Sequence, residues 1–320
     1  MTTAEPTEGG PAMRRRVGFP AGVPCWVDTA QPDPAAAAEF YGGLFGWEFA
    51  DRTTPEAPGR YHVATLGGRD VAGIGSLTGS SAVTGSSAVT GPSAVTGPSA
   101  VTGPARWHTS IGVDSADEAV AKVRKAGGLV ISEPVDVLDA GRTARCVDPA
   151  GASFALWEPR GHLGAELVNA PGTWNWSDLH THDLDGARSF YQDVFGWAAA
   201  PVDLGSGETV MWQRPGYAEF LETFEPGLRA RQAEAGVPAG FADAIGWLLP
   251  LTDGPGEAVA GPHWAVTFAV SDADRSAERA VELGGTLLVG PLDAGPAVRL
   301  AMVRDPQGAV FTVSAYDPGS

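Results

Sequence analysis

The stretch richest in side chains that bind metals or move protons is DLHTH at Asp178–His182. Side chains two residues apart on a strand share one face, so Asp178 and His180 would point the same way if this stretch is extended. His263, from a later stretch, would join them there. Carboxylate and imidazole groups bind transition metals, and they also serve as hydrogen-bonding and acid–base groups. The pattern therefore predicts either a metal site or a cleft with neutral histidines. In the first half of the chain, Asp28 and His108 are the candidates for the same roles.

Two repeated motifs show which elements must position these residues. FYGGLFGW at Phe40–Trp47 recurs as FYQDVFGW at Phe190–Trp197, 190 − 40 = 150 residues later. DPAG at Asp148–Gly151 recurs as DPQG at Asp305–Gly308, 305 − 148 = 157 residues later. The two halves are therefore copies of one another. We predict a polar, disordered tail at 1–20, a first domain at 21–162, a linker at 163–172 and a second domain at 173–320.

Each half has the same order of elements. A short strand, a helix that begins after Asp and ends at Gly, and further strands come first, and the same series then follows again. The chain thus reads as an α+β protein of four βαβββ modules. The repeated SAVTG motif predicts a low-complexity loop at 78–104, because Ser, Thr, Gly and Pro dominate it. An insertion at 215–247 predicts a further helix near 225–235, with aromatic residues over a cleft.

Composition excludes several classes of function. Lys and Arg total 21 against 38 Asp and Glu, so the net charge is −17. Nucleic acids and anionic membranes are bound by basic surfaces, so neither is an expected partner. Cys25 and Cys146 are too few for a disulfide framework. With no apolar run that fits a signal peptide or a membrane span, we expect a cytoplasmic protein.

The arrangement of motifs resembles a known superfamily. Each half has D-x-x-x-A-x-x-FY-x-x-x-FGW after its first strand and DP-x-G before its last. Together with tandem βαβββ modules, these motifs resemble the vicinal oxygen chelate superfamily, the glyoxalase, bleomycin resistance and extradiol dioxygenase group, in its tandem two-domain actinobacterial form. The resemblance implies two domains with cupped mixed sheets. It also implies a divalent metal (Zn, Ni, Fe or Mn) that acts as a Lewis acid on two neighbouring substrate oxygens. It does not select one activity, because the superfamily includes lyases, isomerases, oxygenases and non-catalytic drug binders.

The metal positions that the resemblance implies can be counted from the two motifs. In the first half they are Trp26 on the first strand, His108 on the strand that opens the second module and Ala155 on the last strand. In the second half the same positions hold Trp176, Ala265 and Thr312. Only His108 among these is able to bind a metal. The usual ligand set is therefore largely absent. A relocated site would use Asp178, His180 and His263, or Asp28 and His108.

Aromatic residues occupy the first-strand positions at which the resemblance implies metal ligands. Trp26 and Trp176 are expected on the cup faces, beside Asp28, Asp178 and His180, as in an apolar small-molecule pocket. Trp107 and Trp264 are expected in the core. Arg142 and Arg299 stand at matching places, where each would meet an anionic ligand or form a surface ion pair.

These observations lead to three hypotheses. The first is a glyoxalase-like protein that binds a small molecule in aromatic-lined cups, with no cofactor, its two domains packed as an intramolecular pseudo-dimer. The second is a metal-dependent lyase, isomerase or oxygenase with a relocated site. The third is a non-enzymatic interaction module, with the SAVTG loop as a tether. The octapeptides themselves are interpreted as packing elements, in which Gly ends a helix tucked under a sheet.

Overall fold

The computed structural model describes residues 18–53, 59–77, 105–203, 208–234, 237–251, 261–295 and 297–316. The predicted SAVTG loop at 78–104 lies outside these residues, as does the predicted tail up to residue 17. Residues 18–20 are described, and Phe19 packs against both large core clusters. This part of the predicted tail therefore belongs to the fold.

The first half forms one eight-stranded mixed sheet in the order β2-β3-β4-β1-β5-β8-β7-β6. Strands β1 and β5 meet at its centre, so the two modules of the half join edge to edge. Its elements are β1 (Pro24–Gln31), α1 (Pro34–Phe45), β2 (Glu48–Asp51), β3 (Tyr61–Leu66), β4 (Arg69–Ser76), β5 (Arg106–Gly112), α2 (Ala116–Lys125), β6 (Leu129–Val137), β7 (Gly141–Val147) and β8 (Ser153–Pro159).

The second half repeats this sheet in the order β10-β11-β12-β9-β13-β16-β15-β14. Its elements are β9 (Thr173–Thr181), α3 (Leu184–Phe195), β10 (Ala198–Asp203), β11 (Glu208–Gln213), α4 (Tyr217–Glu222), α5 (Leu228–Glu234), η1 (Phe241–Asp243), β12 (Ala244–Pro250), β13 (His263–Ala269), α6 (Ala273–Glu282), β14 (Thr286–Asp293), β15 (Val298–Arg304) and β16 (Val310–Tyr316). The predicted α+β class and four βαβββ modules are confirmed. The insertion holds α5 close to the predicted helix, and α4 and η1 in addition.

The two octapeptides end the matching helices α1 and α3. Asp33 and Asp183 begin these helices, since the Asp33 carboxylate accepts two backbone N–H groups of the first turn and the Asp183 carboxylate accepts one. Gly46 and Gly196 end them at φ 75° and 71°, in the left-handed region that favours glycine. The predicted Asp start and Gly stop of each helix are therefore both present.

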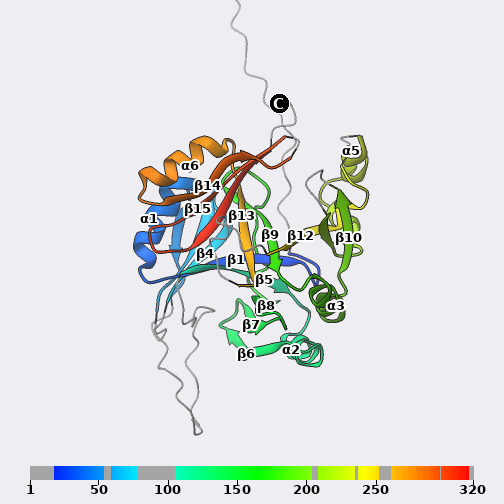
Figure 1. Cartoon of the computed structure of the whole chain (residues 1–320). Helices are drawn as coiled ribbons and strands as arrows, with labels where there is room; N and C mark the ends of the chain where they lie inside the picture. The colour runs from blue at the N-terminus through cyan, green and yellow to red at the C-terminus, as the bar shows by residue number, and fades with distance from the viewer. Residues whose placement is uncertain are drawn as a thin grey trace, which may run out of the picture.

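Helices from different halves lie side by side (Figure 1). Helix α1 of the first half contacts α6 of the second, and α2 contacts α3. Aromatic residues of α1 pack on the second sheet, where the ring of Phe45 lies 4.9 Å from that of Phe268. In the same way, Phe190 of α3 packs on Phe154 of β8. Each half therefore completes the hydrophobic core of the other.

The tyrosine of each octapeptide is hydrogen-bonded to the DPxG motif of the opposite half. The hydroxyl of Tyr41 donates to Oδ2 of Asp305 at 2.8 Å, and that of Tyr191 donates to Oδ2 of Asp148 at 3.1 Å. We call these two contacts the crossed tyrosine–aspartate pairs. Both aspartates are buried, and each also accepts backbone N–H groups of its own turn. The two repeated motifs thus form one interface, used twice.

The tryptophans around each pair extend this interface. The indole N–H of Trp107 donates to the Tyr41 hydroxyl, and that of Trp264 donates to the Tyr191 hydroxyl, both at 3.0 Å. Trp107 and Trp264 are therefore core residues, as the sequence predicts. No helix in the described part of the chain combines the length and apolar character that crossing a bilayer requires.

Candidate functional site

The strand registers place the counted metal positions on one face of each sheet. Asp28 stands opposite His108, and Asp178 stands opposite Ala265. On the last strands, Ala155 pairs with Ser110 and Thr312 pairs with Thr267. The other face of each sheet carries the crossed pairs and the helices. We call the face with Trp26 and Asp28 the first cup, and the face with Trp176 and Asp178 the second cup.

The first cup holds a connected polar cluster. The indole N–H of Trp26 donates to the Tyr61 hydroxyl at 3.0 Å, and this hydroxyl donates to Oδ2 of Asp28 at 3.5 Å. Arg145 reaches the same cup from β7, where it stands opposite Ala155. Asp28 is 2% exposed, His108 3% and Arg145 7%, so the cluster is withdrawn from solvent. The structure thus brings the predicted Trp26, Asp28 and His108 together.

Burial and the Arg145 charge set the protonation of this cluster. Burial raises the pKa of the Asp28 carboxyl, and the nearby Arg145 opposes that rise. Burial lowers the pKa of His108 well below its usual range, and Arg145 lowers it further, so this imidazole is neutral. Burial likewise raises the pKa of Tyr61 well above its usual range. One permanent cation, one carboxyl and two neutral polar groups therefore share the first cup.

Aromatic side chains line one side of the first cup. The ring of His162 packs edge-on against Trp26 at 4.5 Å and lies 5.8 Å from Trp157. The indole N–H of Trp157 donates to the His162 backbone carbonyl at 2.9 Å. Both tryptophans are buried. The linker that begins near His162 thus closes one side of this cup.

The second cup carries aromatic rings around a carboxyl group. The rings of Trp176, Phe241 and Trp247 lie 5.9–6.4 Å from one another. All three are only partly buried, and they pack beside Met211. The backbone N–H of Trp247 donates to Oδ1 of Asp178 at 3.1 Å. Burial outweighs this hydrogen bond and raises the pKa of Asp178 to about 7.

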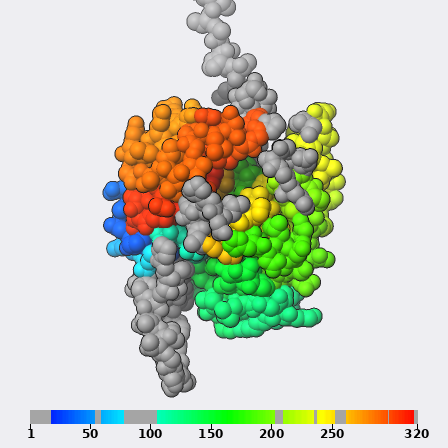
Figure 2. Space-filling model, viewed as in Figure 1, coloured from blue at the N-terminus to red at the C-terminus, as the bar shows by residue number. Residues whose placement is uncertain are grey.

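The surface is open on the side of the second sheet (Figure 2). It is hollowed between the orange β14–β15 region and the yellow-green β10 region. A cavity of about 130 Å³ also adjoins Trp176 and Phe241 on the insertion side. Tyr217 and Phe241, both from the insertion, line this cavity. The aromatic residues of the insertion therefore lie over a cavity, as the sequence suggests.

The two histidines of the second cup form a pair. His180 and His263 stand opposite each other on β9 and β13, with parallel rings whose centroids are 5.0 Å apart. Nδ1 of His263 lies 2.9 Å from the backbone oxygen of Gly261. Among the described residues, no group of three or more His, Cys, Asp or Glu side chains is placed to hold a metal ion.

The residues present do not fit the metal that the resemblance implies. Tryptophan, alanine and threonine occupy the implied ligand positions apart from His108, and none of these is a usual metal ligand. Asp28, which stands opposite His108, lies in the same cup as the Arg145 cation. No step of a mechanism is therefore derived through a metal.

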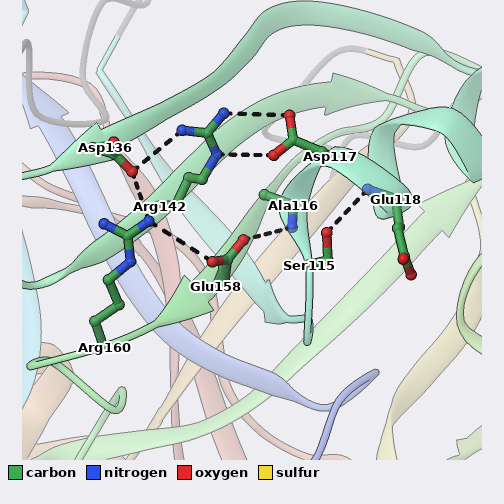
Figure 3. A network of polar contacts seen from close by, with 8 residues as sticks. All are labelled: Ser115, Ala116, Asp117, Glu118, Asp136, Arg142, Glu158 and Arg160. Carbon is green, nitrogen blue, oxygen red and sulfur yellow. Dashed lines mark hydrogen bonds and ion pairs between the residues drawn. The ribbon is translucent and has the colours of Figure 1, made fainter.

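Arg142 and Arg299 lie away from the cups. Arg142 binds Asp117 at the start of α2 and Asp136 on β6, on the helix side of the first sheet (Figure 3). In the same network, Arg160 pairs with Asp136, and Glu158 accepts the Ala116 N–H. Arg299 forms the matching pairs with Asp274 and Asp293. Both arginines thus join a helix start to a strand, which corresponds to the ion-pair alternative.

The sequence analysis named neither Arg145 nor Tyr61 as a cup residue, and it included Phe241 and Trp247 only as aromatic residues of the insertion at 215–247. A signal existed for Arg145, since it lies three residues after Arg142 and therefore on the opposite face of the strand. Tyr61 and Trp247 come from strands with no motif from which to count. Phe241 lies in the insertion, which has no counterpart in the first half.

Comparisons with known proteins agree with this architecture. Residues 26–156 match the model of the glyoxalase/bleomycin resistance protein/dioxygenase superfamily, and residues 174–314 match that of the glyoxalase-like domain. The chain therefore belongs to the glyoxalase/bleomycin resistance protein/dioxygenase superfamily, also called vicinal oxygen chelate, and carries two of its domains in tandem. The predicted family is confirmed.

Particular relatives share most of its length. The chain is 35% identical over 301 residues to a Mycobacterium tuberculosis protein named "Putative glyoxylase CFP32", covering 94% of this chain and 97% of that one. It is also 35% identical over 295 residues to the anthracycline biosynthesis protein DnrV of Streptomyces peucetius, covering 92% and 94%. Among solved structures, the Mn(II)-bound glyoxalase of Novosphingobium aromaticivorans matches with a TM-score of 0.54 at 16% identity, covering 92% of this chain and 82% of that one. The 2,3-dioxygenase LapB of Pseudomonas sp. KL28 matches with a TM-score of 0.55 at 11% identity, covering 92% and 93%. These structural matches show the fold alone.

Proposed function

We propose that this protein binds a planar aromatic small molecule in its second cup, without a metal ion. The observation that carries the proposal is the Asp178 carboxyl beside the partly buried rings of Trp176 and Trp247. Aromatic walls with a few placed polar groups are typical of small-molecule sites. The boundaries of the two domains and a cytoplasmic location remain part of this proposal.

Asp178 is the polar group that this cup offers to such a ligand. With a pKa of about 7, its carboxyl is present in both protonation states near neutral pH. The protonated form donates a hydrogen bond to a keto oxygen, and the ionised form accepts one from a phenolic hydroxyl. A group with its pKa near the working pH is also suited to general acid–base proton transfer. If the protein is an enzyme, we infer that Asp178 moves the proton.

The names of two relatives fit this ligand class. DnrV and DauV are named for anthracycline biosynthesis, and anthracyclines are planar aromatic compounds with keto and hydroxyl groups. The solved metal-dependent relatives hold their ions in a fold of the same kind. Here the donor set differs, so the proposal assigns binding to stacking and to one carboxyl group.

The test is a tryptophan-fluorescence titration with alizarin, a planar dihydroxyanthraquinone. Trp176→Leu should weaken binding about tenfold or more, because an aromatic stacking contact is lost. Trp26→Leu, at the matching position of the first cup, is the control and should bind like the wild type. Equal loss in both variants, or no binding by the wild type, would overturn the proposal.

A second variant tests the role of the carboxyl group without changing the shape of the cup. Asp178→Asn keeps an oxygen that accepts the Trp247 N–H. The wild type should show alizarin affinity that changes with pH around 7, and Asp178→Asn should not. Identical pH profiles would show that Asp178 is not part of the proposed site. The aromatic contacts are tested separately by Trp176→Leu.

A further inference from the structure

The first cup contains a buried cation with donors that the protein does not use. Arg145 is 7% exposed, and its Nε and Nη2 atoms have no hydrogen-bond partner among the described residues. The same is true of Nε2 of His108, which is 3% exposed. Buried polar groups are nearly always hydrogen-bonded, and an arginine especially so. Three such atoms in one cup call for an explanation.

The two arginine atoms form one edge of the guanidinium group. Nε and Nη2 present two parallel N–H bonds, the arrangement that grips two oxygens of a carboxylate at once. Asp28 does not occupy this edge, since the carboxyl hydrogen-bonds to Tyr61 and affects Arg145 only through its charge. The edge is therefore left for an acceptor from outside the described part of the chain.

The position of Arg145 in the sheet explains why it reaches into the cup. It stands opposite Ala155, which in turn stands opposite Ser110 on the strand next to β1. Ala155 is the place where the family resemblance implies a carboxylate ligand. Because alanine is small there, the long Arg145 side chain has room to cross it toward Asp28 and His108. A fixed cation thus lies in the region where relatives hold a metal ion.

The second cup has no arginine at the position that matches Arg145. The residue that corresponds to Arg145 in the second half is Met302, since 145 + 157 = 302. The position matching His108 is Ala265, opposite Asp178. The second copy of the fold is thus built without either group, so the fold does not need them. We propose that the first cup is a separate ligand site for a small carboxylate with neighbouring oxygens, such as a 2-oxo acid.

In this site, one edge of Arg145 binds two oxygens of the ligand. Nε2 of the neutral His108 supplies a third polar contact, and the Trp26 ring forms a wall beside the Tyr61 hydroxyl. The site binds its ligand by charge and paired hydrogen bonds, whereas the second cup offers aromatic surface. It does not depend on the function proposed for the second cup.

The test is isothermal titration calorimetry of the full chain with oxalate, pyruvate and the neutral analogue oxamide. The wild type should bind oxalate and pyruvate and should not bind oxamide. Arg145→Met places the residue of the second cup in the first and should weaken oxalate binding at least about tenfold, because a charged bidentate contact is lost. Arg142→Met is the control, since this arginine lies on the other face of the same strand.

Several outcomes would overturn the proposal. These are no oxalate or pyruvate binding by the wild type, equal binding of oxamide, or unchanged binding by Arg145→Met. If Arg145→Met fails to fold, crystals of the wild type soaked in oxalate decide the matter. Density for oxalate on Nε and Nη2 of Arg145 supports the site, and its absence there overturns it. Alizarin binding by Arg145→Met should be unchanged, which separates this site from the second cup.

Discussion

The two cups are copies of one design that now differ in chemistry. The first is buried and polar, with Arg145, Asp28 and His108 within it. The second is more open, with aromatic rings around Asp178. The strand pairing around the two cups is the same, because the registers β1–β5 and β9–β13 place Asp28 and Asp178 at matching positions. The comparison shows that the strand registers of a cup stay the same while the side chains inside it differ.

A single position shows how small the change can be. Gly73 pairs with Asp28, and a side chain there would come within 2.2 Å of the Tyr61 hydroxyl. In the second half, Leu248 pairs with Leu179 in parallel strands, so the preceding residue Trp247 stands beside Asp178. A glycine thus admits a tyrosine hydroxyl to the first cup. A tryptophan at the matching place supplies an aromatic wall to the second.

The largest effect on stability is expected at the crossed tyrosine–aspartate pairs, which both halves share. Asp305→Ala removes the acceptor of Tyr41, of Gln31 and of two backbone N–H groups, and all of these donors except the Gln307 N–H are buried. We expect a loss of about 3–5 kcal/mol in the free energy of unfolding, measured by urea denaturation. Asp148→Ala removes the acceptor of Tyr191 and of three backbone N–H groups, so it should cost a similar amount. A loss under about 1 kcal/mol in both variants would contradict the importance of the crossed pairs.

The next prediction sets the first cup apart from the second. Asp28→Asn keeps the shape of the side chain but leaves the buried Arg145 cation without a balancing charge. The expected loss in unfolding free energy at pH 7–8 is about 2–4 kcal/mol. Urea denaturation checks it, with the double variant Asp28→Asn/Arg145→Met as control, which should recover part of the loss. No loss in the single variant would show that Asp28 does not balance Arg145.

Asp178→Asn should have the opposite sign. The folded-state pKa of Asp178 is raised to about 7 from 3.8, so the folded state binds this proton more tightly than the unfolded state does. The wild type therefore loses stability from this group as pH rises from about 4 to 7. Asp178→Asn should match the wild type at pH 4 and exceed it at pH 8 by about 1–3 kcal/mol, below an upper bound of about 4. Thermal or urea denaturation at both pH values measures this difference. A less stable variant at pH 8 would reverse our interpretation.

The smallest expected effect concerns metal. Protein purified without chelators and dialysed against Zn, Ni, Fe or Mn should hold less than one ion per chain, because the donor set in both cups is incomplete. His180→Ala should then leave the metal content unchanged by elemental analysis. Stoichiometric metal in the wild type that is lost in His180→Ala would establish the relocated metal site instead.

Much of the fold was predictable from the sequence because its signals are local. The Asp33 carboxylate begins a helix by accepting backbone N–H groups and Gly46 ends it in the left-handed conformation, and the repeat of this pattern indicated a second domain. The strand registers also place Asp28 opposite His108, two residues that the sequence analysis assigned to one face. The crossed pairs were not predictable, because which half's DPxG motif meets Tyr41 depends on packing between distant segments.

The contents of the cups were harder to predict than their positions. Whether Arg145 or Arg142 points into the cup depends on which face of β7 is turned toward it, and the pairing of β7 with β8 sets this. The alternation of residues along the strand does not by itself show which of the two arginines faces the cup. The pKa of Asp178 depends on its burial and on its contact with Trp247 of β12, a strand that no motif in the sequence connects to β9.

The crossed pairs also determine when the protein is able to fold during its synthesis. Tyr41 and Asp305 lie 264 residues apart in the chain. At typical translation rates of about 5–20 residues per second, helix α1 leaves the ribosome at least about ten seconds before the strand that covers it. During that interval the apolar side of α1 lacks its contacts with Phe268 and Phe311, since both residues lie on strands that are synthesised late. The first domain therefore reaches its final packing only after the second domain has been synthesised.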